Sequence, residues 1–164
     1  MTSARYEAVD CLTASRPADG AATQQARVRA LVEVQRRCGG MAPRAVLGGE
    51  FEVGAGAETI FEVSVGAGYD ALVADGHAGL SAAWPFFAGL PAEFAASTLR
   101  GLVDSSCAGS LPPGTLIVDR AAFDEVESAN PVFAQASAAL CCALAAKLHG
   151  LDVDAELRVV MGAW

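Results

Sequence analysis

The fold is decided by residues 90–150, LPAEFAASTLRGLVDSSCAGSLPPGTLIVDRAAFDEVESANPVFAQASAALCCALAAKLHG. Pro91 suits the first position of a helix, and Glu93 stabilises the positive end of the helix dipole. Apolar and small residues then recur at helical spacing, at Phe94, Ala95, Thr98, Leu99, Leu102 and Val103. Gly109 and the Pro112-Pro113-Gly114 run end this element, so the first part predicts a helix followed by a turn.

A strand and a second helix complete this stretch. The segment TLIVDR at 115–120 predicts a strand, with the chain extended as far as Val126. Asn130 and Pro131 suit the cap and the first position of a helix that ends at His149-Gly150. We expect its buried face to contain Phe133, Ala136, Ser137, Leu140, Cys141, Leu144 and Leu148.

Further elements are expected on both sides of residues 90–150. A loosely alternating strand is predicted at 4–14 and a helix at 21–37, which Gly39-Gly40 ends. The segments 45–53 and 58–65 alternate like strands, and the short link Gly54–Ala57 predicts that they form an antiparallel hairpin. A last strand is predicted at 155–161.

The order of these elements predicts an α+β fold. We expect a two-layer sandwich, in which a mixed sheet carries two or three helices packed on one face. The 164 residues fit a single domain, 1–164, and such a chain buries roughly 70% of the surface that its unfolded form exposes.

The charge is divided unevenly along the chain. Residues 1–44, an Arg-rich N-terminal strand and helix extension, hold seven basic and four acidic residues, whereas the acidic body at 45–164 holds four basic and fifteen acidic ones. The net charge is −8. An acidic body repels phosphate, so we expect no DNA binding, and any RNA or partner contact falls to four arginines of the N-terminal part. These are Arg27, Arg29, Arg36 and Arg37.

Cysteine usage and apolar stretches indicate a cytoplasmic protein. The five cysteines form no Cys-x-x-Cys pair and only two histidines are present, so we expect no structural zinc, no other metal, no cofactor and no disulfide framework. The N-terminus MTSARYEAVD lacks the apolar core of a signal peptide. The stretch Val132–Leu148 is too short to span a bilayer, and we expect no membrane segment.

The residues from about 85 to 148 resemble domain IV of elongation factor G. That family opens a helix with Ile-Pro-x-Glu-Tyr, which Leu90–Phe94 is similar to, and its Val- and Asp-rich strand resembles Leu116–Asp119. The family's Glu-Val-Asp-Ser-Ser-x-x-Ala-Phe stretch with its Ala-rich helix is similar to Glu125–Phe133. The resemblance implies two helices on one face of a mixed sheet and a link to translation.

The chain departs from the family's pattern in the parts that work on the ribosome. The family's Gly-rich loop ending in Gln-Tyr-Gly-His has only Gly54–Ala57 as its counterpart, and Ala121–Asp124 replaces a longer loop that contains histidine. These two loops form the tip that enters the decoding site in the family. No G-x-x-x-x-G-K-[ST] motif occurs, so we expect no GTPase module.

Two groups of residues are candidates for chemistry. In the loop Asp75-Gly76-His77-Ala78-Gly79, Asp75 could orient the His77 imidazole for acid–base catalysis, or the loop could simply be solvated. Asp124, Glu125 and Glu127 form an acidic cluster, which fits either a pocket of an enzyme or the stabilisation of the next helix's N-terminus.

Three functions remain open from the sequence. The leading hypothesis is a stand-alone module like domain IV of elongation factor G, associated with the ribosome or binding a protein partner. The alternative is a small-molecule metabolic enzyme with a pocket near His77 and the Asp124/Glu125/Glu127 cluster. The third is a structural subunit of a homo-oligomer, because the apolar fraction is 53% and the core is rich in alanine.

Overall fold

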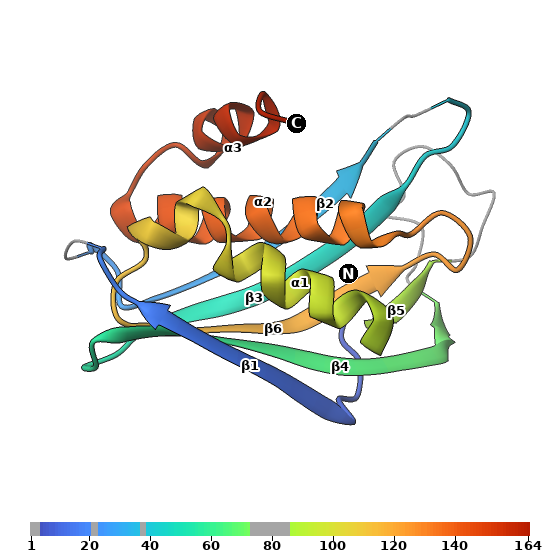
Figure 1. The fold of residues 1–164 in the computed structure, drawn as a ribbon, viewed down its shortest axis with the longest axis horizontal. Coiled ribbons are helices and arrows are strands. Elements are labelled where there is room, and N and C mark those ends of the chain that lie inside the picture. Colours follow the sequence, from blue (N-terminus) through green and yellow to red (C-terminus); the bar gives the residue numbers. More distant parts are fainter. Residues whose placement is uncertain (1–3, 21–22, 37–38, 73–85) are drawn as a thin grey trace.

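In the part of the chain that the structure describes, six strands and three α-helices form two layers (Figure 1). The computed structural model describes residues 4–20, 23–36, 39–72 and 86–164. The strands are β1 (Asp10–Pro17), β2 (Arg27–Gln35), β3 (Arg44–Val53), β4 (Glu58–Leu72), β5 (Phe87–Leu90) and β6 (Gly114–Phe123). The helices are α1 (Ala92–Val103), the short 3-10 helix η1 (Ser106–Ser110), α2 (Asn130–His149) and α3 (Val153–Met161).

The sheet is mixed, as the sequence predicts. Its order is β1-β4-β5-β6-β3-β2, with a direct β4–β6 pairing beyond the end of the short β5. The β4–β6 pair is parallel and the other pairs are antiparallel. The two edge strands, β1 and β2, both come from the Arg-rich N-terminal part of the chain.

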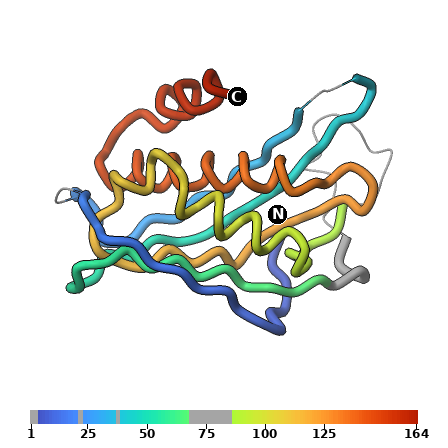
Figure 2. The backbone as a smooth tube through the Cα atoms, in the orientation of Figure 1, coloured from blue at the N-terminus to red at the C-terminus, as the bar shows by residue number. Residues whose placement is uncertain are grey.

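Helices α1 and α2 lie side by side on one face of this sheet (Figure 2). The rings of Phe94 and Phe133 stack between them with their centroids 4.8 Å apart. Gly101 allows the close approach, because a Cβ atom there would lie 2.9 Å from the Cβ of Ser137. Phe94, Leu102, Phe133, Leu140 and Leu144 are buried as expected, whereas Leu99 is only half-buried.

Helix α2 is the centre of the core. Most of its residues are buried, and it contacts β2, β3, α1 and α3. Its 20 residues are long and apolar enough to cross a membrane, contrary to the expectation of a stretch too short to span, but 72% of the apolar window is buried inside the domain. Burial of this kind is typical of a central helix in a folded core.

The helix predicted at 21–37 is wrong, because this segment contains strand β2. Val28, Ala30 and Val34 are buried against the helices, whereas Arg27, Arg29 and the other odd-numbered positions lie on the opposite face. This period of two is that of a strand with one covered face. Adjacent Leu31 and Val32 imitate a helical stripe in the sequence, but their side chains point to opposite faces of the sheet.

The predicted hairpin of 45–53 and 58–65 is also wrong, although both strands exist. β6 lies between β3 and β4 and pairs with each of them. The short link therefore passes the beginning of β6, where the Gly54 N–H donates to the Pro113 carbonyl at 2.9 Å. Gly114 permits this crossing, since a Cβ atom there would clash with the Glu52 carbonyl.

The strand predicted at 155–161 is helix α3. The Asp152 carboxylate accepts hydrogen bonds from the N–H groups of Asp154 (3.0 Å) and Ala155 (3.3 Å) and so caps the helix. This local cap favours a helix over an isolated strand at these exposed residues.

Several boundaries also move. The strand expected at 4–14 lies at Asp10–Pro17, and β6 ends at Phe123 rather than Val126. The helix predicted from Pro91 begins one residue later, at Ala92, and α2 begins at Asn130, one residue before Pro131. The early end of β6 follows from a turn at 124–128 that Asp124 and Ser128 hold together.

Candidate binding cleft

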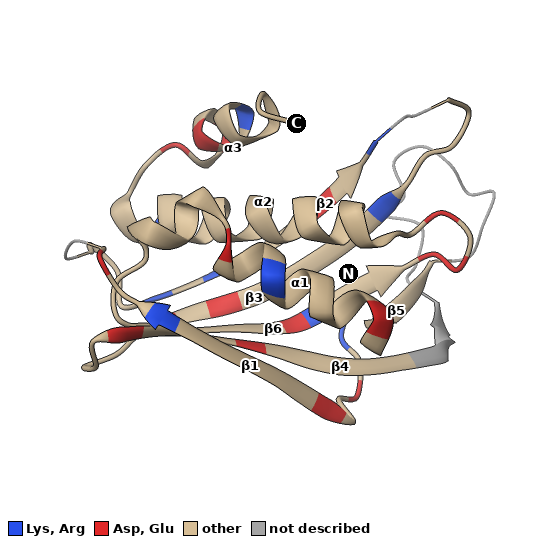
Figure 3. Cartoon of the chain, viewed as in Figure 1, with Lys and Arg blue, Asp and Glu red and all other residues tan. Residues whose placement is uncertain are grey.

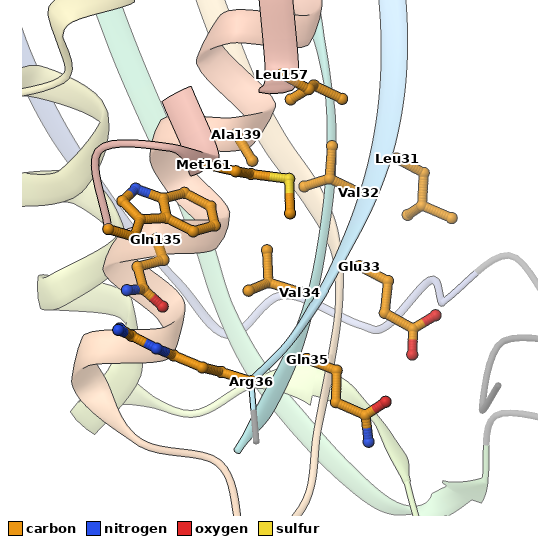
Figure 4. Close-up of a pocket in the computed structure, with 11 residues that line it drawn as sticks. Leu31, Val32, Glu33, Val34, Gln35, Arg36, Gln135, Ala139, Leu157 and Met161 are labelled. Carbon is orange, nitrogen blue, oxygen red and sulfur yellow. The ribbon is translucent and has the colours of Figure 1, made fainter. Parts of the chain in front are cut away.

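An apolar cleft opens between β2, α2 and α3 (Figure 4). Its volume is about 470 Å³, within the usual range for ligand pockets. Seven apolar residues line it: Leu31, Val32, Val34, Ala139, Leu157, Met161 and Trp164. The polar groups Arg36 and Gln135 also border the cleft, and Figure 4 shows the Arg36 side chain pointing toward Gln135.

The cleft exists because α3 is only loosely attached. All nine residues of α3 are described and none is buried; Met161 is 55% exposed. Its half-buried residues Val153 and Leu157 pack against the core, and α2 is the element that it chiefly contacts. Figure 1 shows α3 beyond α2, on the side of the molecule where the sheet ends at β2. The helical layer thus extends past the last strand.

The backbone of β2 forms one wall of the cleft. Figure 4 shows Val32, Val34 and Arg36 pointing toward α2 and α3, whereas Leu31, Glu33 and Gln35 point away. These last three residues nevertheless line the cleft. Their main chain, not their side chains, therefore borders it.

The direction of these main-chain groups follows from the pairing with β3. The Val53 N–H donates to the Ala26 carbonyl at 2.8 Å, and the Arg36 N–H donates to the Pro43 carbonyl at 2.9 Å. The register between β2 and β3 has no shift, so the even-numbered residues of β2 bond to β3 and the odd-numbered ones point outward. No other described strand pairs with β2.

One outward carbonyl of β2 already has a partner. Lys147 at the end of α2 donates from Nζ to the Arg29 carbonyl at 2.6 Å. The segment before β2 is tied down as well, because the Gln24 N–H donates to the Leu148 carbonyl at 3.0 Å. The stretch of edge that borders the cleft therefore begins after Arg29.

The four arginines predicted to contact RNA or a partner do not form one surface. Arg27 and Arg29 lie on the sheet face away from the helices, while Arg36 borders the cleft on the helical side and Arg37 lies outside the described residues. Glu50 bridges the first two, with Nε–Oε distances of 2.7 Å to Arg27 and 2.9 Å to Arg29. No ion pair among the described residues includes Arg36.

The acidic cluster mainly stabilises a turn. Asp124 is 1% exposed and pairs with buried Arg44, with an Nη2–Oδ2 distance of 3.2 Å. Its other oxygen accepts hydrogen bonds from the N–H groups of Val126 (2.8 Å) and Glu127 (3.2 Å). The Glu127 carboxylate accepts from the Ala42 N–H at 3.4 Å, and Glu125 is exposed. These contacts join the turn after β6 to the start of β3.

The candidate catalytic residues Asp75 and His77 lie outside the described residues. In the part of the chain that is described, no group of three or more His, Cys, Asp or Glu residues is arranged to hold a metal ion.

The sequence does not predict the cleft, because it predicts a strand where α3 forms and a helix where β2 forms. The signal was available in the Asp152 cap, the acidic first turn at Asp154 and Glu156, and the spacing of Val153, Leu157 and Met161. Trp164 and Gln135 carry no such signal, since only the packing of α3 beside α2 brings them together.

Comparisons with protein-family models, with curated proteins and with solved structures find no match to this chain.

Proposed function

We propose that this chain is a stand-alone binding module, similar to domain IV of elongation factor G, that associates with the translation machinery through a protein partner and has no GTPase activity. The observation that carries the proposal is the cleft between β2, α2 and α3. It combines an apolar lining, a sheet edge and an arginine, which are features of surfaces that bind protein segments.

The charge distribution supports a protein partner over RNA. Arg27 and Arg29 are neutralised by Glu50, Glu52 and Asp119 on the open face of the sheet. Acidic residues are spread over the strands and loops (Figure 3), and they repel a phosphate backbone. A contact that buries Val32, Val34 and Met161 depends little on such charges.

The helix–strand–helix unit supports the relation to translation. α1, β6 and α2 follow one another in the order that the resemblance implies, and both helices lie on one face of the sheet. The acidic cluster gives little support to the enzyme alternative. Asp124 pairs with Arg44 and accepts a hydrogen bond from the backbone of its own turn.

Co-sedimentation of the purified chain with ribosomes at low and high salt tests the proposal. We expect association that persists at high salt, is lost in Met161→Asp and is retained in Val159→Asp. Both residues are exposed on α3, but only Met161 lines the cleft, so Val159→Asp is a matched control.

Three results would count against the proposal. Association that salt abolishes and Met161→Asp leaves unchanged would indicate an RNA contact. Absence of any association would remove the link to the ribosome. GTP hydrolysis by the purified chain, or a metabolite that raises its melting temperature while nothing sediments, would favour an enzyme.

A further inference from the structure

The layer of helices extends past β2, the last strand on this side of the sheet. β2 is an edge strand, and α3 stands beyond it in the helical layer. The space between them is the cleft, whose walls are apolar side chains of α2 and α3 and the outward main chain of β2. A segment placed there would have a backbone partner on one side and an apolar cover on one face.

We propose that this position receives an extended peptide segment of the protein partner, which adds to β2 as a seventh, antiparallel strand. This inference rests on the proposed function and specifies how its partner is bound. Main-chain bonds to Leu31 and Gln35 hold the segment, and alternate side chains enter the cleft beside Val32 and Val34. A carboxylate of the segment pairs with Arg36.

The chemistry of the segment follows from the register. Positions opposite Val32 and Val34 face α3, so they take apolar, β-branched residues. The position opposite Arg36 takes Asp or Glu, because this guanidinium stands beside an apolar cleft without a carboxylate among the described residues. Positions opposite Leu31, Glu33 and Gln35 lie on the open face of the sheet and take polar residues such as Thr.

A second copy of the chain fits this edge less well. In a two-fold antiparallel pairing of two β2 edges, Arg36 lies opposite an even-numbered residue of the second copy, and Val28, Ala30, Val32 and Val34 carry no carboxylate. A pairing centred on Leu31 also requires Lys147 to leave the Arg29 carbonyl. The edge therefore favours a segment of different sequence.

A synthetic peptide, acetyl-Asp-Thr-Val-Thr-Val-Thr-Asp-amide, tests the inference on the isolated protein. We expect saturable binding by calorimetry and slowed hydrogen exchange at the amides of Leu31 and Gln35. The amides of Val32 and Val34 serve as internal controls, because they already bond to β3. N-methylation of the three threonines, whose amides face β2 in this pairing, should abolish binding.

Charge reversal tests the Arg36 contact. We expect Arg36→Glu to bind the Asp peptide about three- to fivefold more weakly, as for a solvent-accessible ion pair, and to prefer a peptide with Lys in place of both Asp residues. Arg158→Glu, an exposed residue of α3 that does not line the cleft, should keep the original preference.

Distinct results would overturn the inference. Absence of peptide binding, or binding that N-methylation leaves unchanged, excludes strand addition. A dimer in solution with protected Leu31 and Gln35 amides before peptide is added would make the second copy the occupant. If the peptide does not bind while ribosome association still depends on Met161, the result contradicts strand addition but agrees with the proposed function.

Discussion

At the scale of single residues, the Arg44–Asp124 pair is the most deeply buried ion pair among the described residues. Both side chains are almost completely buried, at 2% and 1% exposure. The Arg44 guanidinium also lies over the Phe86 ring, 4.3 Å from its centroid. A buried ion pair of this kind adds little net free energy of folding, because both charges lose their hydration. Removal of one partner is nevertheless strongly destabilising, because the other charge remains buried.

Asp124→Asn should therefore lower the free energy of unfolding by about 3–5 kcal/mol, because Arg44 keeps its charge in a buried site. The asparagine retains an oxygen that accepts from the Val126 and Glu127 N–H groups, so the turn itself is preserved. Urea denaturation measures the loss. Glu125→Gln, an exposed neighbour, is the control and should change stability by less than about 0.5 kcal/mol. Equal effects of the two substitutions would show that the buried pair has no special importance.

At the scale of elements, α3 is held by its cap and a few half-buried contacts. Asp152→Ala removes the acceptor for two N–H groups and should destabilise the helix by about 0.5–2 kcal/mol. Because no residue of α3 is buried, we expect faster amide exchange within 153–161 with little change in the global urea midpoint. A large shift of the global midpoint would mean that α3 belongs to the cooperative core.

Helix α2 carries two buried thiols whose pKa values are raised. Burial raises the pKa of Cys141 to about 12, and burial raises that of Cys142 to about 12 as well. In the unfolded chain these thiols have their ordinary pKa of 9.0, so between pH 9 and 12 the unfolded state holds fewer protons than the folded one. Stability must fall as the pH rises through this window.

We expect Cys141 to contribute a loss of at most about 1.4 kcal/mol per pH unit above pH 9. Urea denaturation under reducing conditions from about pH 8.5 to pH 10.5 measures the slope. Cys141→Ala should reduce this slope and leave the contribution of Cys142, whereas Cys11→Ala, at an exposed position, should not change it. A wild-type midpoint that stays constant over this range would contradict the raised pKa.

The elements that the sequence predicts well are those with local signals and a buried face. α1, β6 and α2 each have proline or glycine at a boundary and apolar residues at the spacing of a single type of element. Their secondary structure therefore depends little on the rest of the chain. β2 and α3 have weaker signals. The alternation of β2 is interrupted by adjacent Leu31 and Val32, and its strand form depends on β3 as a partner. The insertion of β6 between β3 and β4 joins distant segments, which no local pattern predicts.

The candidate site shows the same division. Arg36 was identified from composition alone, but its separation from Arg27 and Arg29 follows only from the alternation of a strand. The apolar lining of the cleft comes from β2, α2 and α3, and the sequence predicts the wrong type for two of them, a helix for β2 and a strand for α3. The volume of the cleft depends on the distance between α3 and β2. The packing of α3 against α2 sets this distance, and the sequence of α3 alone does not predict it.

At the scale of the whole molecule, net charge and ion pairing together decide whether RNA is a partner. The chain carries a net charge of −8, and four unpaired arginines would give a salt slope of about −2 to −4 if they contacted phosphates. Arg27 and Arg29 would first have to leave Glu50, which is only 17% exposed and holds both. Arg36 lies on the opposite face of the sheet, so the three arginines do not form one phosphate-binding surface.

We therefore expect no saturable binding of a short single-stranded RNA at about 150 mM salt, a concentration at which long-range attraction is screened beyond roughly 8 Å. Glu50→Gln is the informative variant, because it removes the carboxylate that neutralises both arginines and should increase any residual RNA binding. Fluorescence anisotropy with labelled RNA over a salt series measures both proteins. Wild-type binding with a slope near −3 that the double substitution Arg27→Ala and Arg29→Ala flattens would contradict this expectation. It would also favour RNA over a protein partner, since the ion pairs on the open sheet face would then be too weak to compete with phosphate.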